Sequence, residues 1–112
     1  MNILIAPNSF KNNLNSFQIA AIIKQAFQSV NQHYKIEIQP LADGGDGTLD
    51  VLSKNFEGKS IKKNVLNPIG KAVESRYFLC DNKCAIIELA EASGLKLLQK
   101  SELNPNIATT YG

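Results

Sequence analysis

Two short apolar segments separated by an amphipathic helix restrict the fold of this chain more than any other feature. Residues 2–6 form an apolar run that ends at Pro7, which is typical of a buried strand in a parallel sheet. Residues 34–41 begin with alternating apolar and polar side chains and predict a second strand. A strand, a helix and a strand in this order favour a right-handed parallel crossover. We therefore predict an α/β chain with a Rossmann-like parallel strand-helix-strand start.

The helix between these strands has both an apolar stripe and a marked beginning. Apolar side chains recur every three or four residues from Ile19 to Val30. Asn15 can cap the helix, and Gln18 can return a hydrogen bond from three residues later. Leu14 before the cap can pack against Ile19 as a hydrophobic staple. The sequence therefore predicts that the helix begins directly after Asn15.

The second half of the chain changes to short strands joined by tight turns. Residues 59–65, 73–79 and 84–89 predict three strands, with turns at residues 67–70 and 81–83. We predict an internal domain boundary near residues 67–70, where hairpins replace the alternation of strand and helix. The expected fold is thus a parallel start followed by short strands and hairpins.

Composition excludes several classes of protein. The 112 residues are 44% hydrophobic and 20% charged, which is typical of a globular chain with a core of its own. Twelve basic and ten acidic side chains give a net charge of +2, too balanced to indicate a nucleic-acid or membrane-surface partner. No segment resembles a signal peptide or a membrane span, so we expect a cytoplasmic protein. His33, Cys80 and Cys84 are too few for a zinc site, and we expect the cysteines to stay reduced.

A glycine-rich turn at residues 42–48 is the first segment that indicates chemistry. Gly44, Gly45 and Gly47 let the backbone approach a ligand closely, and successive amides before a helix can hold an anion. Thr48 adds a hydroxyl group. The alternative is a plain tight turn that caps the following helix.

Carboxylates in the same turn favour a metal-bound phosphate over a free one. Asp43 and Asp46 would repel a phosphate at these amides unless a divalent cation lay between them. Magnesium is usually bound through one or two carboxylates together with substrate phosphates. Lys11 can neutralise a transferring phosphoryl group or pair with a substrate carboxylate, although a loop lysine is more often a solvent-exposed residue.

Three segments are predicted to follow the carboxyl ends of strands, where open parallel sheets bind ligands. They begin at Asn8, Asp43 and Glu88, and we expect all three to border one crevice. The third segment also supplies Ser93 and Gly94, a hydroxyl and a small residue. Capping and solvation are the alternative explanation for its polar side chains.

Four segments of the chain, in this order, resemble the bacterial glycerate kinase family. They are Ile5-Ala6-Pro7-Asn8-Ser9-Phe10-Lys11, Ala42-Asp43-Gly44-Gly45-Asp46-Gly47-Thr48, Glu88-Leu89-Ala90-Glu91-Ala92-Ser93-Gly94-Leu95 and Thr109-Thr110-Tyr111-Gly112. The resemblance covers residues 1–112. Because family members are several times longer, it implies that the chain is the incomplete N-terminal portion of a larger two-domain α/β kinase.

The resemblance implies a kinase that uses ATP and Mg²⁺ to phosphorylate the hydroxyl of D-glycerate, giving 2-phosphoglycerate. Its implied partners are this small-molecule substrate and the missing C-terminal portion of the enzyme. Lys11 and Asp43 are implied in catalysis, and Asp43 and Asp46 in binding the metal. Residues implied in substrate or phosphate binding are Asn8, Ser9, Gly44, Gly45, Gly47, Thr48, Glu88, Ser93, Gly94, Thr109 and Thr110.

Some positions depart from the family pattern, and the length departs most. Asn8 stands where the family usually has Asp, and an amide cannot act as a base. Leu103 stands where the family usually has Arg, so a charge clamp is lost. We expect the 112 residues alone to be inactive; the alternative is a non-enzymatic remnant or binding module with at most weak anion or nucleotide binding. Uncovered apolar strand faces favour a marginal chain that forms homodimers.

Overall fold

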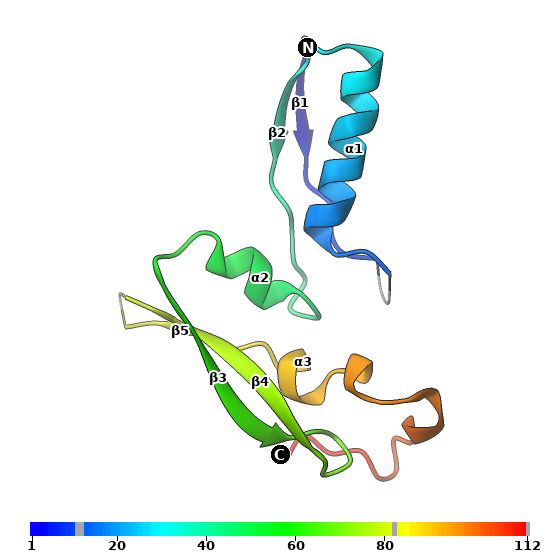
Figure 1. The fold of residues 1–112 in the computed structure, drawn as a ribbon, viewed down its shortest axis with the longest axis vertical. Helices are drawn as coiled ribbons and strands as arrows, with labels where there is room; N and C mark the ends of the chain where they lie inside the picture. Colours follow the sequence, from blue (N-terminus) through cyan, green and yellow to red (C-terminus); the bar gives the residue numbers. More distant parts are fainter. Residues whose placement is uncertain (11–12, 82, 112) are drawn as a thin grey trace. The chain divides into compact units, whose positions relative to one another are not determined.

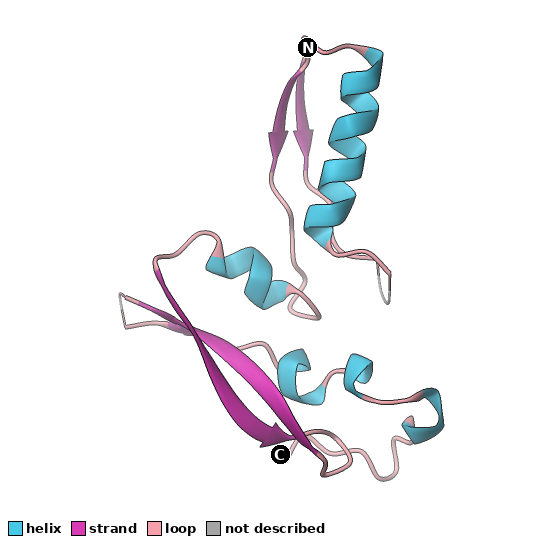
Figure 2. Ribbon diagram, viewed as in Figure 1, coloured by secondary structure: helices cyan, strands magenta, loops and turns pink. Residues whose placement is uncertain are grey.

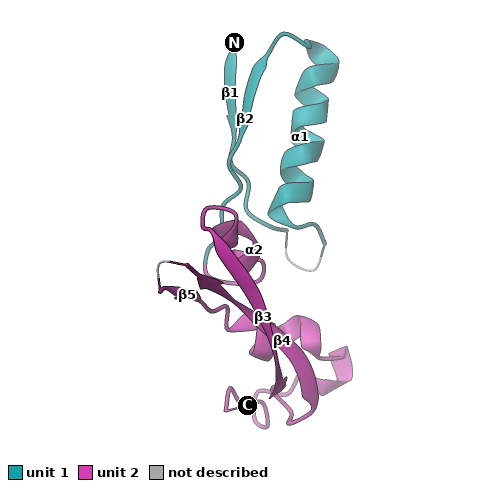
Figure 3. Cartoon of the chain, turned by 60° about the vertical axis from the view of Figure 1, so that its left-hand side comes forward, with its two compact units in different colours: residues 1–43 teal, residues 44–112 magenta. Residues whose placement is uncertain are grey.

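A computed structural model describes residues 1–10, 13–81 and 83–111 of the chain. The fold is mixed α/β, as the sequence predicts, and its helices and strands follow one another as Figure 1 shows. Contacts divide the chain into two compact units, residues 1–43 and 44–112 (Figure 3). This division differs from the boundary expected near residues 67–70, which form a turn inside the second unit.

The first unit is the predicted parallel strand-helix-strand start. Strands β1 (Asn2–Ile5) and β2 (Lys35–Ile38) pair in parallel, and helix α1 (Ser16–Val30) connects them (Figure 2). The register places Ile5 beside Ile38, and Ile5 is buried, as are Ile19 and Ala20 of α1. The other face of β1 is open, with Leu4 63% exposed. The expectation of a fully buried first strand is therefore wrong, because α1 covers one face of this sheet and the face that carries Leu4 is exposed.

The predicted beginning of α1 is confirmed in detail. The side-chain oxygen of Asn15 accepts a hydrogen bond from the Gln18 amide at 2.9 Å, and the Gln18 side chain accepts one from the Asn15 amide at 3.0 Å. This capping box satisfies two amides that have no partner within the helix. The helix starts at Ser16 because this local hydrogen bonding fixes its first turn.

The second unit contains the antiparallel sheet of the chain. Strand β3 (Gly58–Leu66) pairs with β4 (Ala72–Cys80), which pairs with the short β5 (Ala85–Ile86). Helices α2 (Thr48–Ser53) and α3 (Ala90–Ser93) pack against β4, and two 3₁₀ turns follow, η1 (Leu95–Leu97) and η2 (Lys100–Glu102). Leu49, Val51 and Cys80 are buried apolar residues of this unit.

The turn between β3 and β4 is held by one buried amide side chain. The Asn67 side-chain oxygen accepts hydrogen bonds from the amides of Ile69 and Lys71, at 3.1 and 2.9 Å. Side-chain bonds of this kind are the reason that asparagine favours turns. The turn predicted at residues 67–70 is confirmed. Its Pro68 carbonyl also accepts a bond from the Thr109 amide at 3.0 Å.

Candidate functional site

In the first unit, the segments that follow β1 and β2 run side by side. The parallel ladder continues past the strands through hydrogen bonds from the Leu41 amide to the Pro7 carbonyl and from the Gln39 amide to the Ile5 carbonyl, both 2.9 Å. Asn8, Ser9 and Asp43 therefore follow the same carboxyl edge of one parallel pair, as the sequence predicts. The Asn8 side chain accepts a bond from the Ser9 amide at 2.7 Å. Lys11, the cation predicted for this edge, lies outside the described residues.

The third predicted segment belongs to a different sheet. Glu88 comes two residues after β5, and β5 pairs antiparallel with β4 in the second unit. The expectation that residues 88–94 follow a strand of the parallel sheet is therefore wrong. The predicted third strand of the hairpins is also shorter than expected: β5 ends at Ile86, and the chain then turns to bring the Glu88 side chain inside the unit.

The glycine-rich turn folds onto itself and starts α2. Gly47 is the N-cap residue of α2, with a φ of 89° that favours glycine. The Gly44 amide donates to the Thr48 hydroxyl oxygen at 3.1 Å, and the Thr48 amide donates to the Gly45 carbonyl at 3.2 Å. These bonds are those of a tight capping turn, which was the alternative to an anion cradle.

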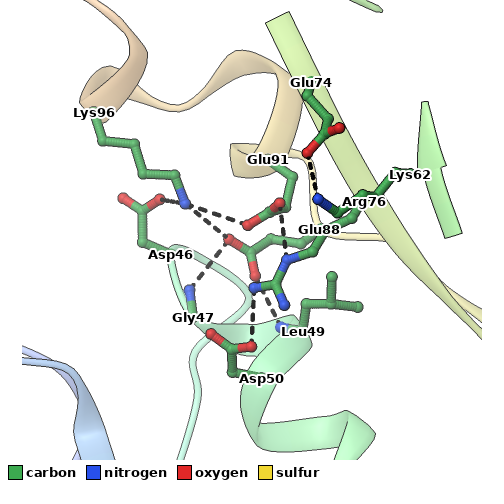
Figure 4. A network of polar contacts seen from close by, with 10 residues as sticks. All are labelled: Asp46, Gly47, Leu49, Asp50, Lys62, Glu74, Arg76, Glu88, Glu91 and Lys96. Carbon is green, nitrogen blue, oxygen red and sulfur yellow. Dashed lines mark hydrogen bonds and ion pairs between the residues drawn. The ribbon is translucent and has the colours of Figure 1, made fainter. Parts of the chain in front are cut away.

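Two further amides at the start of α2 donate to Glu88. One Glu88 carboxylate oxygen accepts from the Gly47 amide at 3.1 Å, and the other accepts from the Leu49 amide at 2.8 Å (Figure 4). The Glu88 side chain has no exposed surface. A buried carboxylate is stabilised by amide donors at the positive end of a helix, and these amides are satisfied in return.

Lys96 supplies a positive charge to the same cluster, and no local sequence pattern predicted it. Its ammonium nitrogen lies 3.1 Å from Asp46, 3.5 Å from Glu91 and 3.9 Å from the Glu88 carboxylate (Figure 4). Burial alone lowers the pKa of Lys96, but the hydrogen bond to Asp46 and the charges of all three carboxylates outweigh it and raise the pKa. The lysine therefore stays protonated at physiological pH.

Arg76 of β4 completes this polar network. Its guanidinium donates to Asp50 of α2 at 2.9 Å and to Glu91 of α3 at 3.2 Å. Burial alone lowers the pKa of Arg76, and the bonds to the two carboxylates reverse that effect and raise it. The network thus joins β4, α2, α3 and η1 and places four carboxylates around two cations.

The other site residues predicted in the second unit mainly make contacts that stabilise the fold. A Cβ at Gly94 would lie 2.4 Å from the Ala90 carbonyl oxygen, so close approach of the backbone explains the glycine. The Thr109 hydroxyl oxygen accepts from the Tyr111 amide at 3.2 Å, while its own amide binds the turn at Pro68. Ser93 ends the short α3, and Thr110 is exposed.

Comparison with known proteins identifies the family. The model of the glycerate kinase family matches residues 3–112. The chain belongs to the glycerate kinase family. It is 40% identical over 111 residues to the glycerate kinase of Halalkalibacterium halodurans and 41% identical over 113 residues to that of Haemophilus influenzae. These matches cover 98% and 100% of this chain but only 29% and 30% of the relatives.

A solved structure of a member of the glycerate kinase family has the same fold. The crystal structure of a putative glycerate kinase 2 from Salmonella typhimurium LT2 superimposes with a TM-score of 0.69 at 34% identity. The match covers 100% of this chain and 31% of that one. The resemblance inferred from the four sequence segments is therefore confirmed, and this glycerate kinase family chain spans about 30% of the length of its relatives.

The acidic residues of this family member fit magnesium that is bound partly by phosphate oxygens. Among the described residues, no three His, Cys, Asp or Glu side chains are grouped as a metal site requires. Magnesium held by one or two carboxylates and by phosphate oxygens needs no such group. Asp46, whose side chain is 53% exposed, can serve in that mode if its carboxylate separates from Lys96. No helix in the described ranges is long and apolar enough to cross a membrane.

Proposed function

We propose that this chain carries part of the machinery with which a glycerate kinase transfers a phosphoryl group from ATP to the 2-hydroxyl of D-glycerate. The observation that supports this most is the family match over residues 3–112. The choice of the 2-hydroxyl is supported by the Escherichia coli relative, named glycerate 2-kinase, which is 33% identical over 113 residues. In this proposal the product is 2-phosphoglycerate, and the use of ATP supports a cytoplasmic location.

Residues of both units have roles in this proposal. Phosphoryl transfer needs mainly positioning and neutralisation of charge. We assign charge neutralisation to Lys11 and acceptance of the hydroxyl proton to Asp43, since Asn8 cannot accept a proton at neutral pH. Bound Mg²⁺, with Asp43 and Asp46 as its carboxylate ligands, would neutralise phosphate charge. Contacts to substrate are assigned to Asn8, Ser9, Thr48, Ser93, Thr109 and Thr110.

We propose that the 112 residues alone do not turn over D-glycerate. The chain spans about 30% of the length of its relatives, so the greater part of those proteins has no counterpart in it. The partner that we propose is the remaining portion of a glycerate kinase.

A chimera tests this function directly. Residues 1–112 would replace the matching segment of the Halalkalibacterium halodurans glycerate kinase, to which they are 40% identical. We expect ADP formation that requires D-glycerate and Mg²⁺, with 2-phosphoglycerate identified by ³¹P NMR. Asp43→Asn should abolish the reaction, whereas Glu74→Gln, on an exposed strand face, should leave it unchanged.

One outcome would decide against the kinase, and a second would then favour the alternative. A chimera that folds, judged by circular dichroism and a cooperative thermal transition, but forms no ADP in response to D-glycerate contradicts the proposal. If amide resonances of the 112-residue chain nevertheless shift on addition of ATP or glycerate, the alternative of a binding module is supported instead.

A further inference from the structure

Glu88, which the family resemblance implies in substrate or phosphate binding, is a buried ionisable residue to which the proposed reaction assigns no contact. It lies in an irregular segment between β5 and α3, and its neighbours Ile87 and Leu89 are 77% and 62% exposed. The chain thus leaves two large apolar side chains in solvent while it buries a carboxylate. Burying a charge costs free energy unless the charge is paired and hydrogen-bonded, so the contacts of Glu88 must offset that cost.

The hydrogen bonds of Glu88 come from the glycine-rich turn and the start of α2, and its ion pair comes from η1. Both carboxylate oxygens accept backbone hydrogen bonds, from Gly47 at 3.1 Å and from Leu49 at 2.8 Å. The Lys96 ammonium nitrogen lies 3.9 Å from the same carboxylate and 3.1 Å from Asp46. Glu88 therefore holds the backbone of the turn through the Gly47 and Leu49 amides. Lys96 holds the exposed Asp46 side chain through an ion pair.

A phosphate group could reach these amides only by replacing Glu88. The Gly47 and Leu49 amides already have an anionic acceptor, and the Gly44 and Thr48 amides donate within the turn. Asp46 and Glu91 contact the Lys96 ammonium, as Glu88 does. Their negative charges oppose the approach of a second anion. The Gly47 and Leu49 amides therefore already bind an anion of the protein itself, the Glu88 carboxylate.

We propose that Glu88 is a positioning residue of the glycine-rich turn: its carboxylate occupies the Gly47 and Leu49 amides permanently, so that phosphate groups do not bind there and Asp46 is held at the surface. The inference rests on the proposed function only for the choice of phosphate-bearing ligands. It assigns the glycines a conformational role and leaves ligand contacts to side chains such as Asp46.

The first test needs no variant. The ¹⁵N-labelled 112-residue chain is titrated with inorganic phosphate and, separately, with ATP and Mg²⁺, while amide resonances are followed by NMR. We expect the resonances of Gly47 and Leu49 to stay within the spread of other buried amides. Saturable shifts of both resonances with inorganic phosphate would overturn the proposal, because they would show that phosphate displaces the carboxylate.

Two variants test the positioning itself. Glu88→Gln offers one oxygen acceptor in place of two, so the Gly47 or the Leu49 amide resonance should move upfield while those of β3 stay unchanged. Lys96→Met keeps the hydrogen bonds from the Gly47 and Leu49 amides to Glu88 but removes the ion pair with Asp46. It should therefore shift the resonances of Asp46 and leave the Leu49 amide resonance unchanged. Glu74→Gln, in the exposed Lys62 pair, is the matched control and should move neither.

Results of these experiments separate the two proposals. Unchanged Gly47 and Leu49 resonances in a well-folded Glu88→Gln variant would overturn the positioning role, whatever the chimera does. If Glu88→Gln fails to fold, the Lys96→Met spectrum and the phosphate titration of the unaltered chain still decide the outcome. A chimera without kinase activity would contradict the proposed function alone.

Discussion

Glu102 is a residue whose ionisation depends on two neighbours that can be removed one at a time. Its carboxylate accepts a hydrogen bond from the Lys71 ammonium at 2.5 Å and another from the Gln99 amide at 2.9 Å. The Lys71 bond is the main cause that lowers the pKa of Glu102, followed by the bond from Gln99. Since folding lowers this pKa, the associated stabilisation is present above the unfolded pKa and is lost as the pH falls through the folded one.

Lys71→Met should therefore raise the pKa of Glu102 and shift the acid unfolding transition to higher pH. Carboxyl ¹³C NMR during a pH titration measures the first effect, and circular dichroism measures the second. Lys62→Met is a suitable control, because Lys62 on β3 pairs with Glu74 on β4. An unaltered Glu102 titration in Lys71→Met would show that the ion pair has no influence in solution.

Gly94 offers a prediction about packing. A Cβ there would meet the Ala90 carbonyl oxygen at 2.4 Å, and a backbone atom cannot move aside as a flexible side chain can. Gly94→Ala should destabilise the chain by about 1–3 kcal/mol, the usual cost of overpacking. Urea denaturation followed by circular dichroism measures this change. Ser101→Ala, at an exposed position, should change stability far less, and equal stability of the two variants would contradict the clash.

The residues of the polar network also show what a sequence cannot reveal. Asp46 and the glycines were predicted because they stand together in one segment. Lys96 and Arg76 were not predicted, because they meet Asp46, Asp50 and Glu91 only after separate elements have packed. Glu88 was expected at the border of a site, and its burial against two amides followed from no local pattern.

At the scale of elements, α1 is the part of the chain that local rules describe best. Its apolar stripe and its capping box depend on residues within a few positions of each other, so both were predictable. The length of β5 was not, because the chain leaves the sheet at Ile87 to bring Glu88 to α2. The exposed face of β1 was also not predicted, because the burial of a strand face depends on which elements pack against the sheet and not on the strand's own sequence.

The capping box of α1 can be removed by a single substitution. Asn15→Ala removes the acceptor for the Gln18 amide and should lower the free energy of unfolding by about 1 kcal/mol. Thermal denaturation and amide hydrogen exchange in the first turn of α1 are the measurements. The control is Asn13→Ala, which removes an exposed asparagine that caps no helix. If the two variants unfold alike, the capping box contributes nothing to stability.

Across the whole chain, large apolar side chains remain in solvent in both units. Leu4 is 63% exposed in the first unit, and Ile87 and Leu95 are 77% and 70% exposed in the second. Contiguous patches of such residues mark surfaces that bind other proteins, whereas single exposed apolar side chains are common. The expectation of a chain that associates with itself therefore stays a prediction.

Self-association should be visible by sedimentation velocity. We expect the 112-residue chain to form dimers or larger species as its concentration rises, and Ile87→Lys with Leu95→Lys should shift it toward monomer. Lys59→Glu, a charge change on an exposed strand position, is the control for altered net charge. A monomer at all concentrations, with no binding of a hydrophobic dye, would contradict the prediction.

The β3–β4 hairpin sets an order in which the two units acquire structure. Its nine paired positions are joined by a turn of five residues, so the paired residues are close together in the sequence. Strand β1 must instead wait for β2, on the far side of a fifteen-residue helix. Local pairings form faster than distant ones because less chain entropy is lost in closing the loop. Although the first unit leaves the ribosome earlier, the hairpin of the second is expected to be the faster of the two to fold.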